Sequence, residues 1–361
     1  MTNKIGILTF QNTLNYGAVL QTYALQRCLQ SATDNEVEVI NYFNDAVTLR
    51  ETPVHFSSLR SVKQLVKFIL NNRAEKRKYK AVKSFCYENV EYSKLDYTES
   101  SNPCFDDYKA IVAGSDQIWN LNLTDGDVKY MLEGYKGKGY SYAASIGTED
   151  IQDKMAIEAI KRLRMVSVRE STAQAELQSH GIESELVCDP TFLLKKEEWF
   201  RMLPNPKIQR KYILLYQMTT SDKIFRFAKD LARRKDAVLI NANPISLQMF
   251  KSRCIRDASP LEWLSLIKNA ECVVTNSFHG LAFSINFEKE FYTEICDNEA
   301  KNSSRLFSLL NILGLNNRNI SSPDYVGGPI DYLKVSDKLN CYRAVSCDYI
   351  KRIVKDINYA E

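Results

Sequence analysis

The tetrapeptide Ser277-Phe278-His279-Gly280 is the part of the chain best suited to acid–base chemistry. The apolar run 272–275 before it predicts a strand, and the amphipathic segment after it predicts a helix. An imidazole at that junction can give or take a proton near neutral pH, and the amino end of a helix attracts anions. His279 is one of three histidines in the chain. We therefore interpret it as a functional residue, although a lone histidine is more often structural.

A second group of polar residues follows the apolar run that ends at Ala113. Asp116, Gln117 and Trp119 are the residue types of a sugar site, where amides and carboxylates bind hydroxyls and an aromatic ring covers the apolar face of the sugar. The alternative is a turn in which Asp116 caps a helix and Trp119 belongs to the core.

Two loops of small and polar residues have the same position relative to a predicted strand. In the loop 12–18, Asn15 can cap the following helix and Gly17 lets a ligand approach the backbone closely. The run 141–147, which contains Ser145, can line a cleft with its backbone. A capped helix with a tight turn, and simple close packing, are the alternatives for the two loops.

Two arginines are candidates for binding an anion. Arg169 ends a predicted strand, and its planar guanidinium matches a phosphate or a carboxylate bidentately. Arg305 lies about one helix length after His279 and can bring a second positive charge to the same place. An exposed Arg169-Glu170 arrangement and an ordinary arginine in the first turn of a helix are the alternatives.

The elements that must position these residues alternate between strands and helices along most of the chain, which indicates an α/β protein with parallel sheets. We predict two Rossmann-like domains that face each other across a cleft. The first spans residues 1–188 and contains a helical insertion at about 45–93, with helices near 58–70 and 74–91. A break at Asp189-Pro190-Thr191 leads to a second domain at 197–335 and a C-terminal helix at 336–361.

Composition excludes several classes of protein. The 48 basic and 44 acidic residues are too balanced for a nucleic-acid-binding face. The nine cysteines include no C-x-x-C pair, so a metal site is not expected. No apolar stretch has the length of a membrane span or of a signal peptide, which favours a cytoplasmic location. The basic segment 58–83 either rests on an anionic membrane surface as a peripheral contact or forms a solvated helical face.

Six segments in order resemble the polysaccharide pyruvyl transferase family: NYGAVLQTYAL, AGSDQIWN, SYAASIG, VSVRE, CDPTFLL and TNSFHGLAFSI. The resemblance implies a two-domain fold similar to that of the GT-B glycosyltransferases. It also implies transfer of a pyruvyl group from phosphoenolpyruvate to two hydroxyls of a sugar, which gives a cyclic ketal and free phosphate. The acceptor would be a sugar or lipid-linked oligosaccharide of a capsule, exopolysaccharide or cell wall, and no cofactor is implied beyond the donor substrate.

The resemblance also suggests roles for individual residues. His279 and Asp116 would be catalytic, the first as proton donor or phosphate-stabilising group and the second as acceptor of a hydroxyl proton. Donor phosphate and carboxylate would meet Arg169, Ser277, Gly280 and Arg305. The acceptor sugar would meet Asn15, Tyr16, Gly17, Ser115, Gln117, Trp119 and Ser145.

Two positions depart from the family pattern. Many relatives have an acidic residue at the position of Ala18, and many have an arginine at the position of Ser277. The second departure removes a cation, for which we expect Arg305 to substitute. A GT-B glycosyltransferase that uses a nucleotide-sugar and a non-catalytic glycan-binding protein are the alternative functions.

Overall fold

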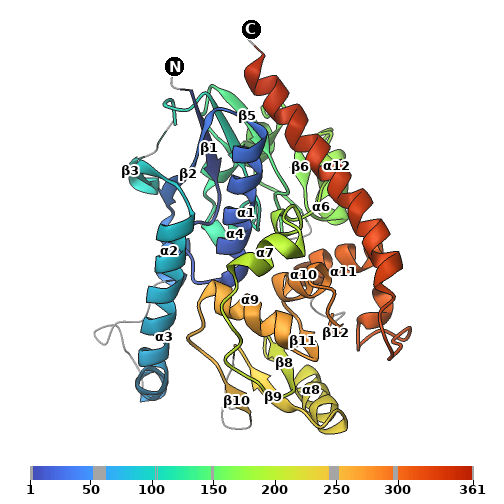
Figure 1. Ribbon diagram of the computed structural model, residues 1–361. Helices are drawn as coiled ribbons and strands as arrows, with labels where there is room; N and C mark the ends of the chain where they lie inside the picture. The colour runs from blue at the N-terminus through green and yellow to red at the C-terminus, as the bar shows by residue number, and fades with distance from the viewer. Residues whose placement is uncertain are drawn as a thin grey trace.

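Two parallel five-stranded sheets organise the protein in the computed structural model, which describes residues 3–51, 62–101, 103, 105–147, 150–243, 252–295 and 300–359 (Figure 1). The first has the order β3-β2-β1-β4-β5 and the second the order β10-β9-β8-β11-β12. This confirms the predicted α/β architecture with two Rossmann-like halves. The strands of the first half are β1 (Lys4–Leu8), β2 (Glu36–Phe43), β3 (Tyr92–Thr98), β4 (Ala110–Ala113) and β5 (Lys138–Ser141), and those of the second are β8 (Tyr212–Tyr216), β9 (Val238–Asn241), β10 (Arg253–Cys254), β11 (Cys272–Thr275) and β12 (Phe291–Thr293).

A short pair of strands continues the first sheet beyond β5. β6 (Ser167–Val168) pairs in parallel with β7 (Glu185–Leu186), and single bridges join Tyr140 to Met165 and Ala144 to Val168. The main helices of the first half are α1 (Tyr16–Ala32), α5 (Lys154–Lys161) and α6 (Ser171–Ser179); α7 (Lys196–Met202) connects the halves; and α8 (Asp222–Arg234), α9 (Pro260–Asn269), α10 (Phe278–Asn286) and α11 (Ala300–Leu313) belong to the second.

The central strands are nearly continuous apolar runs because helices cover both faces of a parallel sheet. All four residues of β4 and all five of β8 are buried. The helices show the complementary amphipathic pattern: in α8 the apolar residues Ile224, Ala228 and Leu231 are buried, while the charged residues between them face outward.

The insertion between β2 and β3 differs from the prediction. It contains α2 (Asp45–Glu51) and a single long helix α3 (Val62–Asn89) in place of two helices, and residues 58–61 of the predicted first helix lie outside the described residues. The expected break near residue 72 was wrong because no proline or glycine interrupts Asn71-Asn72-Arg73. The insertion ends at the edge strand β3, which carries exposed polar side chains and so lacks the apolar pattern of the central strands.

The basic segment 58–83 is described from residue 62, and three of its cations, Arg77, Lys78 and Lys83, interact within the protein, the last with the Asn12 side chain. Arg77 forms an ion pair with Asp257 at 2.6 Å, and the ammonium of Lys78 lies 4.3 Å from the centre of the Tyr16 ring. Arg73, Lys76 and Lys80 are exposed. Contact with a membrane surface stays a prediction, and within the described ranges no helix has the length and apolarity needed to cross a bilayer.

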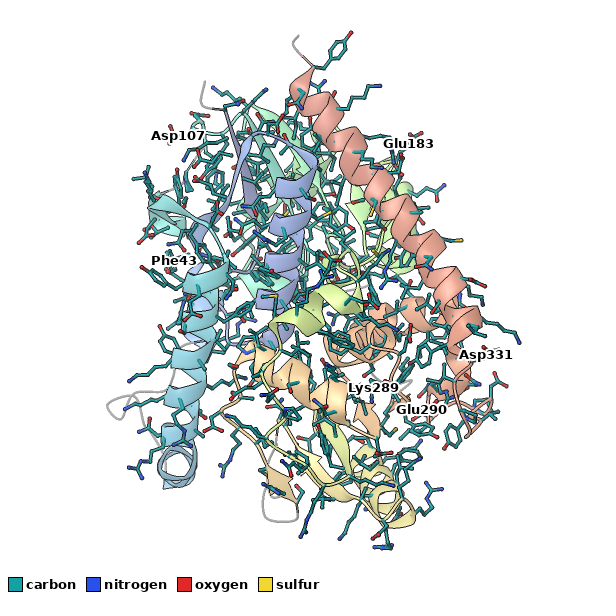
Figure 2. The ribbon with its side chains drawn as sticks, viewed as in Figure 1. Phe43, Asp107, Glu183, Lys289, Glu290 and Asp331 are labelled. Atoms are coloured by element: carbon teal, nitrogen blue, oxygen red, sulfur yellow. The ribbon has the colours of Figure 1, made fainter. Side chains whose placement is uncertain are left out.

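Both halves are covered by the last helix, α12 (Tyr332–Asn358), which runs along one side of the molecule (Figure 1). It begins in the second half, where the Ile330 N–H donates to the Glu290 carboxylate at 2.6 Å, close to Lys289 and Asp331 (Figure 2). It then packs on the first half, where the Tyr349 hydroxyl donates to the Ser141 carbonyl at 2.9 Å. The helix therefore begins four residues before the expected boundary and ties the two halves together.

Aromatic side chains fill the contact between the halves. The ring of Tyr16 in α1 stacks on Trp263 in α9 with centroids 5.3 Å apart, and its hydroxyl donates to the Ala258 carbonyl at 2.8 Å. Trp199 of α7 packs edge-on against Phe283 of α10 at 5.3 Å. These residues belong to one hydrophobic cluster that includes side chains of both sheets.

Replacement of Tyr349 by alanine tests the importance of α12 for the first half. Removing this fully buried ring leaves a cavity and loses a hydrogen bond, so we expect the free energy of unfolding to fall by about 3–5 kcal/mol. Urea denaturation measures this, with Tyr359→Ala as control because Tyr359 is 72% exposed on the same stretch of chain. Equal effects of the two substitutions would contradict the role of α12.

Candidate active site between the two halves

A cavity of about 350 Å³ lies between the carboxyl ends of the two sheets. In each sheet it lies at the point where the strand order reverses, between β1 and β4 and between β8 and β11, which is where open α/β sheets bind ligands. The predicted site residues in its wall are Asn15, Asp116, Gln117, Ser277, His279 and Arg305. Residues that are far apart in the sequence, and that come from both halves, are thus brought to one place.

Three helices point their amino ends at this cavity. The capping side chains Asn15, Ser221 and Ser277 accept hydrogen bonds from the backbone N–H groups of Gly17, Ile224 and Gly280 at the starts of α1, α8 and α10. All three caps line the cavity. Because the amino end of a helix carries a partial positive charge, the wall favours an anionic ligand before any charged side chain is counted.

His279 lies in the first turn of α10, which begins at Phe278, two residues earlier than the expected start near Gly280. The side chain is 5% exposed and lies in the cavity wall. Its ring packs directly on the backbone of α1, because a Cβ atom placed on Gly17 would be 2.0 Å from the ring Nδ1. The imidazole from the other half occupies the space that a side chain at position 17 would need. The imidazole, and not a bound sugar, is therefore the reason for a glycine here.

Asp189 connects the imidazole to Arg169. Its Oδ2 lies 2.6 Å from Arg169 Nη1 and 3.7 Å from His279 Nε2, while its Oδ1 accepts from the Thr191 N–H and hydroxyl at 3.0 and 2.7 Å. Burial alone would raise the pKa of Asp189, but His279, Arg169 and the Thr191 N–H hold that pKa well below its usual range. Asp189 therefore stays ionised and holds Arg169 by a short ion pair, while His279 Nε2 lies within ion-pair distance of it but has no hydrogen-bond partner among the described residues.

Arg169 supports the site from behind the cavity wall. It is 3% exposed, its Nη2 lies 3.3 Å from Asp116 Oδ1, and its guanidinium carbon lies 4.3 Å from the centre of the Phe278 ring. The structure places it below the residues that line the cavity, so the expected direct contact with a donor phosphate is not supported by its position. It acts on the site through Asp116 and Asp189.

Asp116 lines the cavity, but its carboxylate is already engaged. Oδ1 contacts Arg169 and also accepts from the Gln117 N–H at 2.9 Å. Burial favours the neutral form, but Arg169, His279 and Arg305 outweigh it and lower the pKa of Asp116 below its usual range. A carboxylate held in this way is a weak proton acceptor, so its position favours an electrostatic role over the predicted role as base.

Arg305 of α11 brings a cation into the cavity wall. Burial and the nearby Arg169 lower its pKa to about 10, against the opposing effect of Asp116, so the group is still charged at neutral pH. With the Gln117 amide oriented so that its oxygen faces Arg305, that oxygen accepts from Nη1 and Nη2 at 3.1 and 3.2 Å. This contact connects the loop after β4 with the second half.

Two aromatic residues predicted to bind the acceptor lie elsewhere. Trp119 is 1% exposed in the core of the first half, where its Nε1 donates to the Tyr130 carbonyl at 3.1 Å. Tyr16 packs on Trp263 in the contact between the halves. Neither ring lines the cavity, so neither can cover the face of a sugar there. The prediction for these two residues was wrong because their sequence positions gave no information on the direction of the side chains.

Three small residues of the predicted site also have structural partners. The Ser115 hydroxyl donates to the Ala143 carbonyl at 2.8 Å, and the Ser145 hydroxyl donates to Glu170 Oε1 at 2.8 Å, both within the interior. A Cβ atom on Gly280 would lie 2.5 Å from Thr275 Oγ1, so this glycine allows close packing of α10 on the sheet. These residues shape the loops around the cavity without lining it.

The residues that sequence reasoning missed are Asp189 and Glu294. The segment containing Asp189 was interpreted as a break between domains, although Asp189 lies three residues after the end of β7, just as Asp116 lies three residues after the end of β4. Glu294 directly follows β12 and lines the cavity. Within the described ranges, no three histidine, cysteine or carboxylate side chains are grouped as metal ligands would be.

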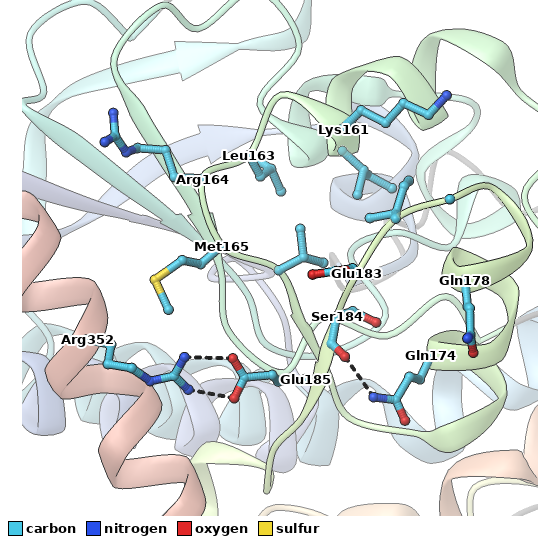
Figure 3. Close-up of a pocket in the computed structure, with 14 residues that line it drawn as sticks. Lys161, Leu163, Arg164, Met165, Gln174, Gln178, Glu183, Ser184, Glu185 and Arg352 are labelled. Carbon is cyan, nitrogen blue, oxygen red and sulfur yellow. Dashed lines mark hydrogen bonds and ion pairs between the residues drawn. The ribbon is translucent and has the colours of Figure 1, made fainter.

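A second hollow, of about 900 Å³, lies on the outside of the first half between β6, β7, α6 and α12 (Figure 3). Its main charged side chains satisfy each other: Arg352 Nη1 and Nη2 lie 2.8 and 2.5 Å from the Glu185 carboxylate. Gln174 similarly donates to the Ser184 carbonyl at 2.7 Å (Figure 3). This hollow contains none of the predicted site residues, so the cavity between the halves is the candidate active site.

Two Rossmann-like halves with a cavity between the carboxyl ends of their sheets define a GT-B fold. The structure is similar to a putative UDP-N-acetylglucosamine 2-epimerase from Listeria monocytogenes, with TM-score 0.50 and 7% identity over 98% of this chain and 91% of that one. It also matches a UDP-GlcNAc 2-epimerase from Methanocaldococcus jannaschii, with TM-score 0.45 and 12% identity over 93% and 92% of the two chains. An E. coli heptosyltransferase gives TM-score 0.39 and 13% identity over 83% of this chain and 90% of that one.

Residues 15–297 match the model of the polysaccharide pyruvyl transferase family, so the chain belongs to this family of enzymes. The match confirms the resemblance seen in the six sequence segments, and it includes the cavity-lining residues that follow β4, β8, β11 and β12. No curated protein sequence matches the chain. Because the sequence identity to these solved structures is low, the similarity to them supports the fold and no particular function.

Replacement of Gly17 by alanine tests the contact between α1 and His279. The added methyl group has no room beside the ring, so we expect the imidazole to be displaced, enzyme turnover to be lost and stability to fall by about 1–3 kcal/mol. Gly327→Ala is the control, because its Cβ would meet nothing nearer than 3.7 Å. A Gly17→Ala enzyme with normal turnover would show that the ring position is not critical.

Replacement of Asp189 by asparagine tests the buried ion pair. Leaving Arg169 without its partner should cost about 3–5 kcal/mol of unfolding free energy at pH 7. Because the folded-state pKa is lowered, Asp189 stabilises the wild type above pH ~4, and this contribution is lost as pH falls further. The difference between the two proteins should therefore shrink in urea titrations carried out at decreasing pH. The exposed Asp230→Asn is the control and should change stability by less than ~1 kcal/mol.

Proposed function

We propose that the protein transfers the pyruvyl group of phosphoenolpyruvate to two hydroxyls of a sugar, forming a cyclic ketal and releasing phosphate. The observation that carries the proposal is the convergence of three helix amino ends, Arg305 and His279 on one cavity in a member of this family. A volume of about 350 Å³ lies within the ~300–1,000 Å³ range of small-molecule sites. The acceptor would be a precursor of a capsular, exopolysaccharide or cell-wall glycan.

The donor carries a phosphate and a carboxylate, and the second half offers partners for both. Arg305 supplies a permanent charge, and the amino ends of α8 and α10 supply oriented backbone dipoles. Ser277 stands where many relatives have an arginine; its hydroxyl caps α10, and Arg305 enters the same cavity wall. This arrangement supports Arg305 as the substitute cation.

The reaction needs one proton donor, for which His279 is the candidate. Transfer of its proton to the methylene carbon turns that carbon into a methyl group, while the oxygen of one sugar hydroxyl bonds to the central carbon and loses its own proton. The second hydroxyl then bonds to the same carbon, and phosphate leaves with the electron pair of its C–O bond and takes up the second proton. Asp189 and Gly17 hold the imidazole in place for the first step.

The first half would bind the acceptor. Asn15, Gln117 and Asn120 present amide groups in the cavity wall. Amides of this kind bind sugar hydroxyls. We propose that the acceptor is lipid-linked and that the protein works at the cytoplasmic face of a membrane with no cofactor beyond phosphoenolpyruvate.

Phosphate release from phosphoenolpyruvate with a panel of lipid-linked glycans, followed by mass spectrometry of the ketal, tests the proposal. His279→Ala should lower kcat by about 10²- to 10⁴-fold, the usual contribution of a positioned acid, without unfolding the protein. The matched control is His180→Ala, a histidine on α6 that pairs with Glu176 at 3.0 Å. Ketal formation at a near-normal rate by the His279 variant would refute its role.

Thermal stabilisation separates the donor from its main alternative. Phosphoenolpyruvate should raise the melting temperature of the wild type, because a ligand that binds the native state stabilises it. Stabilisation by nucleotide-sugars alone would instead indicate a glycosyltransferase with the same architecture.

A further inference from the structure

Glu294 is a buried carboxylate that the proposed reaction has not yet used. It directly follows β12, is 5% exposed and lies in the wall of the cavity. Its Oε2 has no hydrogen-bond partner in the described part of the chain. A buried acceptor left without a donor costs about 1–3 kcal/mol, and more for a charged group, so this position is unfavourable unless a ligand completes it.

The sheet register places Glu294 near His279. Thr275 of β11 is the direct partner of Thr293 of β12, so Asn276 and Glu294 are the next residues on neighbouring strands. Such strands are about 4.8 Å apart. Since His279 is three residues beyond Asn276 and lines the same cavity, carboxylate and imidazole come from adjacent strand ends of one sheet.

The other acids near the site are already engaged. Asp116 and Asp189 both pair with Arg169, and the Oε1 of Glu170 accepts from the Ser145 hydroxyl and the Ile146 N–H at 2.8 and 3.1 Å. An oxygen engaged in this way is poorly placed to receive a further proton. Glu170 Oε2 also has no hydrogen-bond partner among the described residues, but Glu170 does not line the cavity, whereas Glu294 lines it and has an unpaired Oε2.

The chemistry of Glu294 selects a hydroxyl group. A carboxylate repels the phosphate and carboxylate of the donor but accepts hydrogen bonds from the hydroxyls of a sugar. Its neighbours in the cavity wall include Thr219, Asn276 and Ser303, which can also bind hydroxyls. The anion-binding groups Arg305 and the start of α10 thus share one cavity with a group suited to the acceptor.

We propose that Glu294 binds an acceptor hydroxyl and takes its proton as that oxygen bonds to the central carbon of the pyruvyl group. The electron pair of the O–H bond becomes the new C–O bond, the proton passes to the carboxylate, and the methylene carbon receives its proton from His279. The protonated Glu294 then gives its proton back to His279 through solvent, so that both groups regain their starting state, while the proton of the second hydroxyl leaves with the phosphate. This assignment rests on the proposed pyruvyl transfer. It makes Glu294 the base of the reaction in place of Asp116, whose carboxylate is paired with Arg169.

Glu294→Gln keeps the size of the side chain and removes its basicity. With phosphoenolpyruvate and the same panel of lipid-linked glycans as acceptors, we expect kcat to fall by about 10²- to 10⁴-fold. The KM for phosphoenolpyruvate should change little. Glu294→Asp should restore part of the rate, and Glu271→Gln, an exposed glutamate at the opposite end of β11, should behave as wild type.

The pH profile distinguishes a base from a residue that only supports the fold. Wild-type kcat should decrease on the acid side as a carboxylate is protonated, and Glu294→Gln should lose that decrease. Among the described residues, the other charged or ionisable side chains that face the cavity are Arg50, Asp116, His279 and Arg305, so Asp116→Asn is measured in parallel and should keep the acid limb.

The possible outcomes separate this inference from the function on which it rests. If the wild type forms ketals and Glu294→Gln keeps kcat within threefold, the inference is wrong and pyruvyl transfer stands. If Glu294→Gln keeps the acid limb of the wild-type pH profile, the role of Glu294 as base is likewise wrong, and pyruvyl transfer stands. If the wild type releases no phosphate with any glycan of that panel, the proposed pyruvyl transfer fails, and the role of Glu294 fails with it.

Discussion

The carboxylate of Asp189 is the constraint on which the arrangement of the site depends. It is fully buried, pairs with Arg169 of the first half and lies 3.7 Å from His279 of the second. A buried charge is tolerable when its partners are close, so the halves must meet in the geometry that supplies them. The backbone at Gly17 adds a steric limit on the other side of the imidazole. Together these contacts fix the position of the His279 imidazole relative to the cavity.

The fold was predictable where the physics is strong and local. The central strands β1, β4, β8 and β11 are covered on both faces, and their apolar runs reveal them. The edge strands β3 and β10 were not predicted, because exposed positions accept polar residues and dilute the pattern. The length of α3 was also missed, since helix continuity through Asn71-Asn72-Arg73 depends on the absence of a breaker more than on any positive signal.

The candidate site was predictable only to the level of loops. Parallel strands bring their carboxyl ends to one edge, so His279, Asp116 and Asn15 could be placed together from sequence. Which way a side chain leaves such a loop depends on tertiary packing, and this is why Trp119 entered the core. Asp189 was missed because Pro190 after it indicated a turn. Its ion-pair partner Arg169 is 20 residues away in the sequence and comes close only in the folded protein.

The long helix α12 has a consequence for how the protein is made. Its Tyr349 and Tyr342 hydroxyls donate to the carbonyls of Ser141 and Val187, so it covers a sheet whose strands were translated far earlier. During synthesis that sheet leaves the ribosome with part of its apolar surface bare, and such surface is prone to aggregation. A nascent chain stalled before residue 332 should therefore depend on chaperones, and release of the helix should complete the native fold of both halves at once.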